Sequence, residues 1–555
     1  MNSILNVGIF ANVDAGKTTL TEAICVEAGI KRFAGRVDKG TTISDNKHIE
    51  KEKGITITTT LLSFEKNEKL INVLDTPGHF DFFPDAMRII SIIDIAILVI
   101  AVDSGVTPHT KRILKSLILN DVKIIIFINK CDRIDYLSKL NKIRNDIYEC
   151  SNQIDESKLF FIEGSALKNK NISTLFEMIV KEEIVRGREA KDNFHGKVIK
   201  QEFDELGACL TYVYIYEGKL RINDILIKNK KQNKIKFLYL KVKDKLINTK
   251  VIDKGNIAII KSYETYYSVG DEIKNYEVIE VTPMFIEGYR CKVKLAGNGT
   301  KDQLYKALLE ISIEEPNYQF EYDDMTDEMS INLLGNTHED VVRLHLFYKY
   351  GIDVDILENS NIKARRIVEK NIFFIKVNQK CNKHAATMEL KIEPQSSEDN
   401  VFISDVSKGY LRNSYQKAIE ESIMSFLSCS KKGYVYTNLK VTLTYAEYYS
   451  GVSTPGDYRR LAYEMIENLC ETSKFYELYE YEYFELLSVK KYISVLFNQL
   501  YLFKVEILDL QNIASDKSLI KGALPKEFKR SFYLFLKDIM KDDFLYRKIK
   551  TRWLR

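Results

Sequence analysis

The sequence predicts a multidomain fold: an α/β domain with a mostly parallel sheet, a small β-barrel, and then three α+β domains. Three observations predict it. The chain has 555 residues, more than one hydrophobic core normally holds. In the first part of the chain, long apolar runs alternate with helical patterns. Short runs bounded by turns follow, and a strand-helix-strand pattern then returns. The expected domains are residues 1–190, 191–287, 288–360, 361–474 and 475–555.

In the first domain, five apolar runs have the continuous character of strands that are buried on both faces of a parallel sheet. They are Leu5–Phe10, Leu70–Leu74, Ile95–Val102, Lys123–Ile128 and Leu159–Ile162. Helical patterns between these runs give βαβ units, and repeated units give a doubly wound sheet.

The second domain is predicted to be a β-barrel because its runs are short, β-rich and bounded by turns, as in Leu210–Tyr216. Lys228–Lys234 has the composition of a solvated hairpin turn. In the third domain, strands are expected at Arg290–Leu295 and Met329–Leu334, and helices at Asp302–Ile311 and His338–Tyr350. Two further α+β segments follow.

Composition is that of an ordinary globular protein, with 45% hydrophobic and 29% charged residues. The 82 basic and 78 acidic residues leave a net charge of +4, which neither requires nor excludes nucleic acid. The eight cysteines are scattered without a CxxC pair, which argues against zinc and a disulfide framework. Ile4–Phe10 has no basic region before it, and the apolar stretch Ile92–Val102 is too short to span a bilayer. We therefore expect a soluble, cytoplasmic monomer that does not contact membranes.

A phosphate-binding loop follows the first strand. Its residues are Asn12, Val13, Asp14, Ala15, Gly16, Lys17, Thr18 and Thr19. Backbone N–H groups around Gly16 would hold the β-phosphate, Lys17 would reach the β and γ oxygens, and the Thr18 hydroxyl would bind Mg²⁺. The helix expected from Thr19 to Ala28 adds its positive N-terminal dipole.

Three further strings, each at the end of a predicted strand, complete a guanine nucleotide site. In Asp75–His79, Asp75 would hold Mg²⁺ through water, and the Gly78 N–H would sense a γ-phosphate. The other two strings supply Asn129, Lys130 and Asp132, and then Ser165, Ala166 and Leu167. Asp132 would accept two hydrogen bonds from guanine, which adenine cannot donate in that pattern, and the 165–167 backbone would donate to guanine O6. The sequence thus predicts GTP and Mg²⁺ as cofactors.

These strings resemble the translational GTPases, whose two switch segments are similar to Gly54–Ile57 and Asp75–Phe82. Within that group the chain looks most like the tetracycline-resistance ribosomal protection proteins. The stretches that carry this closer resemblance are Val37–Thr42, Ala307–Ser312, Ser407–Leu411 and Tyr448–Pro455. Elongation factor G has the same domain order but carries an insert in its GTPase domain. About 30 residues separate Leu167 from the expected barrel, which is too few for such a subdomain.

The resemblance implies roles for further residues. Thr56 would bind Mg²⁺ and close over the γ-phosphate, and His79 would be the catalytic residue that orients the attacking water. Asp14 would help to bind a monovalent cation, or would simply cap the loop backbone. The family usually has histidine at the position of Asn12, arginine at Lys53 and proline at Gly451. Ala86 and Ile95 also differ from its commonest pattern, and none of these differences removes a nucleotide ligand.

The fourth domain would bring a tip loop into the decoding site of the small ribosomal subunit, as the resemblance implies. The expected ribosome contacts are Tyr448, Tyr449, Ser450, Gly451, Val452, Ser453, Thr454 and Pro455. Tyrosines in such a loop can stack on splayed RNA bases, or they can pack on their own sheet. Glycine in place of proline suggests a less rigid loop, so we expect Gly451→Pro to strengthen protection if the local φ permits proline.

The final nine residues form a second candidate RNA contact. They contain Arg547, Lys548, Lys550, Arg552 and Arg555 beside Trp553. Such a basic end could bind ribosomal RNA phosphate, or it could be a solvated tail.

The resemblance implies a GTPase that binds the small-subunit decoding site and the large-subunit factor-binding site of the ribosome and dislodges tetracycline. Two alternatives remain open. One is a factor similar to elongation factor G that acts in translocation or on stalled ribosomes, without drug resistance. The other is a regulatory ribosome-binding module with little turnover.

Overall fold

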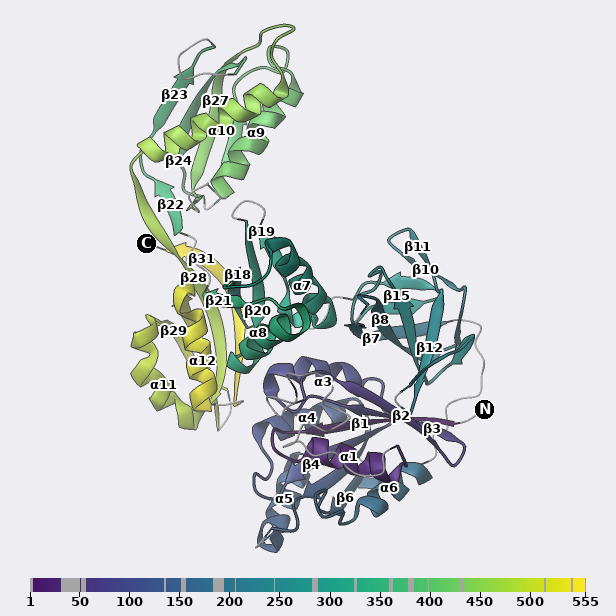
Figure 1. Cartoon of the computed structure of the whole chain (residues 1–555). Coiled ribbons are helices and arrows are strands. Elements are labelled where there is room, and N and C mark those ends of the chain that lie inside the picture. Colours follow the sequence, from purple (N-terminus) through teal and green to yellow (C-terminus); the bar gives the residue numbers. More distant parts are fainter. Residues whose placement is uncertain are drawn as a thin grey trace. The chain divides into compact units, whose positions relative to one another are not determined.

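The fold is taken from a computed structural model (Figure 1). It describes residues 3–30, 50, 56–133, 136–150, 156–182, 194–204, 206–243, 245–281, 288–323, 327–358, 363–377, 384–397, 399–428, 430, 434–513, 516–540 and 543–554. The chain separates into two compact units. Unit 1 comprises Met1–Gly288, Val293–Phe320 and Ile331–Ile356, and unit 2 comprises Tyr289–Lys292, Glu321–Ser330 and Leu357–Arg555. The five-domain division therefore stays a prediction. Val37–Thr42, Lys53, Gly54, Ile55 and Arg555 lie outside the described residues.

Unit 1 begins with a six-stranded sheet in the order β2-β3-β1-β4-β5-β6 (Figure 1). Its strands are β1 (Ser3–Ala11), β2 (Thr60–Lys66), β3 (Lys69–Asp75), β4 (Ile95–Ala101), β5 (Lys123–Asn129) and β6 (Leu159–Glu163). All neighbours pair in parallel except β2, which is antiparallel to β3. The five apolar runs predicted to be strands are β1, β3, β4, β5 and β6. The edge strand β2 was not predicted.

Helices cover both faces of this sheet. They are α1 (Lys17–Glu27), α3 (Phe83–Ile90), α4 (Pro108–Leu119), α5 (Tyr136–Cys150) and α6 (Ile172–Lys181). One apolar core joins α1 and α6 to the sheet, and another joins α3, α4 and α5 to it. Two separate cores on two faces establish the doubly wound architecture that the βαβ pattern predicts.

A β-rich segment follows in unit 1. Its strands are β7 (His195–Phe203), β8 (Cys209–Glu217), β9 (Lys219–Arg221), β10 (Ile225–Lys228), β11 (Lys231–Lys234), β12 (Phe237–Val242), β13 (Lys245–Asn248), β14 (Val251–Asp253), β15 (Ile257–Ser262), β16 (Glu272–Lys274) and β17 (Glu277–Ile279). Nine of them form one sheet, β9 pairs with β14, and a single apolar core is lined from strands all round the segment, as in a barrel. Lys228 pairs with Lys231, so the predicted turn is the tip of the β10–β11 hairpin.

The next segment alternates strands and helices in chain order. Its elements are β18 (Tyr289–Leu295), α7 (Lys301–Glu314), β19 (Glu321–Asp323), β20 (Glu328–Leu333), α8 (Asn336–Tyr350) and β21 (Val354–Glu358). The strand-helix-strand order agrees with the sequence pattern. Thr300 caps α7 through a capping box with Gln303.

Unit 2 contains an α+β fold in residues 363–472. Its elements are β22 (Lys363–Ile367), β23 (Asn371–Ile375), β24 (Thr387–Pro394), β25 (Val401–Ser404), α9 (Asn413–Ser428), β26 (Tyr434–Tyr436), β27 (Leu439–Glu447) and α10 (Pro455–Thr472). The sheet β23-β24-β27-β25 packs against α9 and α10 around one apolar core. The predicted tip loop joins β27 to α10.

The last fold of unit 2, which we call the C-terminal fold, has the order βαββαβ. Its elements are β28 (Phe475–Val489), α11 (Ile493–Gln499), β29 (Glu506–Asn512), β30 (Lys517–Pro525), α12 (Lys529–Met540) and β31 (Phe544–Leu554). Strands β31 and β30 flank β28, and β29 lies beyond β30. The interpretation of the basic end as a tail is therefore wrong for residues 547–554, which lie in strand β31. None of the described helices is long and apolar enough to cross a membrane.

Candidate nucleotide site and tip loop

The phosphate-binding loop lies where β1 turns into α1, at the carboxyl end of the sheet. Gly16 is the N-cap of α1 and has φ of 87°, a left-handed conformation that glycine adopts without strain. A Cβ at Gly16 would lie 2.3 Å from the Asn129 Nδ2 atom. Glycine is therefore needed here both for backbone conformation and for space.

Asn12, which departs from the expected family pattern, makes two hydrogen bonds that hold this loop in place. Its Oδ1 accepts a hydrogen bond from the Val13 N–H at 2.9 Å, and its Nδ2 donates to Thr107 Oγ1 at 3.2 Å. Thr107 is the N-cap of α4. The asparagine thus connects the phosphate loop to the start of a neighbouring helix, so the departure from the family pattern leaves the loop supported.

Two of the predicted metal ligands contact the Lys17 ammonium group, and a third, Thr18, lies beside one of them. Lys17 Nζ lies 2.6 Å from Asp75 Oδ1 and 3.1 Å from Thr56 Oγ1. The Thr18 and Thr56 hydroxyl oxygens are 3.4 Å apart. Lys17, Thr56 and Asp75 are all buried. A buried lysine is stable here because the Asp75 carboxylate offsets its charge.

This cluster fits a hydrated Mg²⁺ ion. Mg²⁺ prefers hard oxygen ligands and keeps several waters, so two hydroxyls and one carboxylate acting through water are a suitable set. The described residues contain no group of three His, Cys, Asp or Glu side chains placed to hold a metal ion. The expected Mg²⁺ site differs from such a group, because its direct protein ligands would be the hydroxyls of Thr18 and Thr56 and because Asp75 would act through water.

The second switch segment follows β3. A Cβ at Gly78 would lie 3.4 Å from the Ala11 carbonyl oxygen, so this glycine runs close to the end of β1. His79 Nδ1 accepts a hydrogen bond from the Asp81 N–H at 3.2 Å. With Nδ1 as an acceptor, the neutral ring carries its proton on Nε2. That nitrogen lies 3.3 Å from Thr337 Oγ1, in the first turn of α8.

The contact between His79 and α8 has further support. The Phe82 ring meets the His338 ring edge-on, with centroids 5.1 Å apart. Ile57 and Phe82 share a small buried cluster with Val341. Residues that follow the predicted switch threonine and the predicted switch histidine therefore both pack on α8. No motif pointed to Thr337, because it lies 258 residues away from His79 in an ordinary amphipathic helix.

An ion network of buried and part-buried side chains continues from the first switch. Thr59 donates its N–H and its hydroxyl to Asp85 Oδ2, each at 2.7 Å. Arg88 donates to Asp85 Oδ1 at 2.7 Å and to Glu315 Oε2 at 2.8 Å. Burial alone would lower the pKa of Arg88, but the two carboxylates outweigh burial and raise it. Burial opposes ionisation of Glu315 as well, yet Arg88 holds its pKa below the ordinary value.

The predicted base-binding residues come together through Asn129. Its Nδ2 donates to the Ala15 carbonyl at 2.9 Å, and its Oδ1 accepts from the Ala166 N–H at 2.9 Å. Asp132 is exposed, and a hydrogen bond from the Ser165 side chain lowers its pKa. Lys130 has φ of 64°, and its Nζ atom lies 3.6 Å from Asp103 Oδ2.

The 165–167 string is divided in its exposure. Ser165 and Ala166 are buried, whereas the Leu167 side chain is 74% exposed. For Leu167, it is therefore the backbone N–H and not the side chain that is a candidate for the guanine contact. The structure thus brings all the predicted nucleotide strings to one end of one sheet.

The tip loop is held from within its own fold. Tyr449 OH hydrogen-bonds to Thr387 and Glu447, each at 2.8 Å, and the Tyr448 ring packs edge-on against Tyr415. Ser453 Oγ donates to the Ala385 carbonyl at 2.6 Å. Thr454 caps α10 with a capping box. The two tyrosines therefore pack on their own fold, and the exposed apex consists of Ser450, Gly451 and Val452.

Gly451 corrects one expectation. Its φ is 76°, a left-handed value, whereas a proline ring fixes φ at about −65°. Proline is incompatible with this backbone, so Gly451→Pro would distort the loop rather than stiffen it. A Cβ at Gly451 would meet no atom within 4 Å, so the backbone conformation and not the available space is what favours glycine here.

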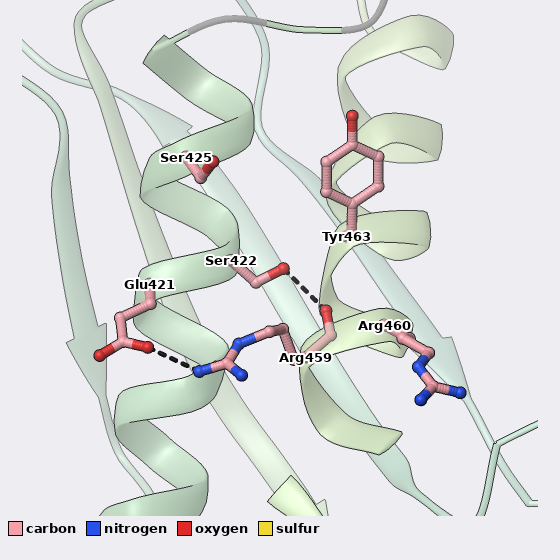
Figure 2. A pocket seen from close by; sticks show the side chains of 6 residues that line it. All are labelled: Glu421, Ser422, Ser425, Arg459, Arg460 and Tyr463. Atoms are coloured by element: carbon pink, nitrogen blue, oxygen red, sulfur yellow. Dashed lines mark hydrogen bonds and ion pairs between the residues drawn. The ribbon is translucent and has the colours of Figure 1, made fainter. Parts of the chain in front are cut away.

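A separate hollow lies between α9 and α10 (Figure 2). It measures about 410 Å³ and is lined by Glu421, Ser422, Ser425, Arg459, Arg460 and Tyr463. Arg459 and Glu421 form an ion pair at 2.7 Å, and the Ser422 hydroxyl donates to the Arg459 carbonyl. No residue of the predicted nucleotide site or tip loop lines it.

Comparisons with known proteins agree with this architecture. Residues 2–183 match the elongation factor Tu GTP binding domain, and residues 361–474 match domain IV of elongation factor G. The fold is similar to the crystal structure of ttk003000868 from Thermus thermophilus. The TM-score is 0.78 at 17% identity, over 100% of this chain and 98% of that one.

Relatives extend over nearly the whole chain. Tetracycline resistance protein TetS of Listeria monocytogenes is 28% identical, covering 96% of this chain and 93% of its own length. TetO of Campylobacter jejuni and TetM from transposon Tn1545 of Enterococcus faecalis are each 28% identical, over 94% of this chain and 91% of theirs. The chain binds GTP and is a GTPase.

Proposed function

We propose that this chain, which belongs to the translational GTPases, is a ribosomal protection protein that dislodges tetracycline. The observation that carries the proposal is that relatives named for tetracycline resistance match at least 94% of the chain. The nucleotide strings lie within the residues that match the elongation factor Tu GTP binding domain, and the tip loop lies within those that match domain IV of elongation factor G. A relative that had kept only one of these two parts would support a narrower function.

In the proposed cycle, GTP binds at the carboxyl end of the sheet. Lys17 Nζ would leave the Asp75 carboxylate and contact the β and γ oxygens, since phosphate oxygens offer it a stronger multidentate partner. Bound Mg²⁺ would neutralise charge that develops on the phosphate oxygens, held by Thr18, Thr56 and, through water, Asp75. Asp14 is an exposed residue of the phosphate-binding loop with φ of 60°, and it is the candidate ligand for a monovalent cation.

Hydrolysis would need His79 to point an attacking water at the γ-phosphate. Phosphoryl transfer requires mainly positioning and charge stabilisation, so one oriented nitrogen has a large effect. In the described arrangement Nε2 of His79 is engaged by Thr337. The ribosome would redirect the ring, which explains why the free chain should turn over slowly.

The tip loop would act at the small-subunit decoding site, and the GTPase domain at the factor-binding site of the large subunit. The exposed Ser450, Gly451 and Val452 form a small apex that fits a narrow RNA cleft. The chain would act as a monomer in the cytoplasm, where bacterial ribosomes work. GTP hydrolysis would then release it.

The deciding experiment is growth of a tetracycline-susceptible bacterium that expresses this chain, beside Lys17→Ala as the matched control. Resistance with the parent and none with the variant supports the proposal. If the parent gives no resistance yet shows ribosome-stimulated GTP hydrolysis, the alternative of a translocation or stalled-ribosome factor replaces it. If ribosomes do not stimulate hydrolysis at all, the non-catalytic module is the better description.

A further inference from the structure

The two faces of the sheet in the C-terminal fold differ in what covers them. On one face, Phe484 of β28 packs against Phe532 of α12 and stacks on Tyr546 of β31, with centroid distances of 5.6 and 5.1 Å. Phe484, Leu486 and Phe532 are fully buried. This face forms the core of the fold.

The opposite face carries alternating residues of β28, because successive side chains of a strand point to opposite sides. In Tyr479-Glu480-Tyr481-Glu482-Tyr483 the tyrosines therefore lie on this open face. The two glutamates point the other way and pair with Lys526 and Lys529 at 2.7 and 2.8 Å.

The register of β31 places cations directly beside the tyrosines. Tyr481 is opposite Arg552, Tyr483 is opposite Lys550, and Glu485 is opposite Arg547. Directly opposed residues of an antiparallel pair share a face. Lys550 Nζ lies 5.3 Å from the centre of the Tyr483 ring, within range of a cation–π contact. We call Tyr479, Tyr481, Tyr483, Arg547, Lys550 and Arg552 the tyrosine–arginine face.

This face is accessible, and its β31 edge is cationic. Tyr479 is 43% exposed, the other two tyrosines are half-buried, and all three cations are exposed. Glu477 and Glu485 of β28 lie on this side too, and Glu485 is paired with Lys521 at 3.2 Å. Glu506 and Asp509 of β29 share the face at the opposite edge of the sheet, because the strand register aligns them with Tyr483 and Glu485 through β30.

We infer that the tyrosine–arginine face binds single-stranded or looped RNA. Planar rings two residues apart offer successive platforms for unstacked bases, and the neighbouring cations suit the phosphates between them. A paired helix would offer phosphates but hide the faces of its bases, so its fit would be poorer. The inference adds a second RNA contact to the proposed function, in a fold other than that of the tip loop.

The test is fluorescence anisotropy with the full-length chain and a labelled single-stranded RNA of roughly ten nucleotides, a length within the usual site size. We expect the double variant Tyr481→Ser, Tyr483→Ser to lose roughly 100-fold in affinity, because each base stacked on an aromatic ring contributes about tenfold or more. The variant Tyr481→Phe, Tyr483→Phe should bind like the parent. The matched control Tyr263→Ser, Tyr501→Ser removes two exposed tyrosines elsewhere and should have no effect.

Charge is tested separately, with variants that do not alter the tyrosines. Arg547→Gln with Lys550→Gln should reduce the slope of log affinity against log salt by about 1.4, since each phosphate contact on single strands contributes about 0.7. Lys491→Gln with Lys504→Gln, two exposed lysines on other segments, is the control for net charge.

Binding of the serine variant at parental affinity would overturn the inference, as would equal affinity for a duplex of the same sequence. GTP binding by each variant shows that unit 1 is intact, and circular dichroism shows that the whole chain is folded. Because the assay uses RNA without ribosomes or drug, its failure leaves tetracycline release unaffected. If the chain binds RNA at this face but confers no resistance, the proposed function fails and the inference about the tyrosine–arginine face stands.

Discussion

The Nε2 atom of His79 lies 3.3 Å from the Oγ1 atom of Thr337. A nitrogen that donates to this hydroxyl cannot orient a water molecule at the same time. The catalytic candidate is therefore restrained by α8, and the proposed mechanism requires that this restraint is released before rapid hydrolysis.

Thr337→Val should raise GTP hydrolysis in the absence of ribosomes by about two- to tenfold, the range that corresponds to one lost neutral hydrogen bond. Thr337→Ser, which keeps the hydroxyl, is the control and should hydrolyse like the parent. Single-turnover rates with saturating GTP measure the effect. A basal rate that is equal in all three proteins would show that the contact does not restrain His79.

His79→Ala should bind GTP normally yet lose ribosome-stimulated hydrolysis by roughly two or more orders of magnitude, the scale for losing a positioning group. The measurement is the single-turnover rate at saturating ribosomes, with GTP affinity measured in parallel. An unchanged rate would remove His79 from the mechanism.

Asp132→Asn should weaken GTP and favour xanthosine triphosphate, because the amide offers a donor where the C2 carbonyl of xanthine needs one. Ser165 already holds the Asp132 carboxylate in its charged form. Calorimetry with both nucleotides gives the comparison. If the variant binds GTP like the parent, Asp132 does not read the base.

Loss of the tip loop is expected to abolish protection while leaving GTP binding intact. A deletion of Ser450 to Thr454 would also remove the cap of α10 and the Ser453 contact, so a substitution at the apex is cleaner. Val452→Asp places a negative charge on a side chain that is 65% exposed, where RNA phosphate would repel it. Release of labelled tetracycline from ribosomes, measured on filters, should fall, whereas Val251→Asp on the barrel should release drug normally. Normal release by Val452→Asp would exclude the apex as the effector.

Glu315→Gln should destabilise unit 1 by about 3–5 kcal/mol, because Arg88 would be left buried with an incomplete partner. The same pair predicts a pH dependence. The pKa of Glu315 is lower in the folded chain than the unfolded value of about 4.3, so its stabilisation is present above that pH and is lost as the pH falls through the folded pKa. Urea unfolding at pH 7 and at several pH values below about 4.3 should show a smaller loss of stability on acidification for the variant than for the parent.

The nucleotide strings could be located from the sequence because each one is local and follows a strand that apolar runs reveal. Gly16 and Asp75 are recognisable for this reason. Contacts between segments that are distant in the sequence have no local pattern by which they could be predicted. Thr337 reaches His79 only after the chain folds, and Glu315 reaches Arg88 across 227 residues.

Two local errors have different physical causes. The edge strand β2 ends in polar residues and lacks the continuous apolar run of its neighbours, so its pattern was weak. The basic end looked like a tail because charged residues dominate it, yet its backbone pairs with β28 along most of its length. Edge strands can tolerate this composition, since charges there also discourage association with other chains.

Asn129 has a consequence for selectivity. Its side chain donates to the Ala15 carbonyl of the phosphate loop and accepts from the N–H of Ala166, which is one of the predicted base-binding residues. A nucleotide whose base fails to order residues 165–167 would loosen Asn129, and with it the loop around the phosphates. Discrimination between purines would then affect the rate of hydrolysis as well as the affinity. A nucleotide with the wrong base would be bound more weakly and would also be hydrolysed more slowly.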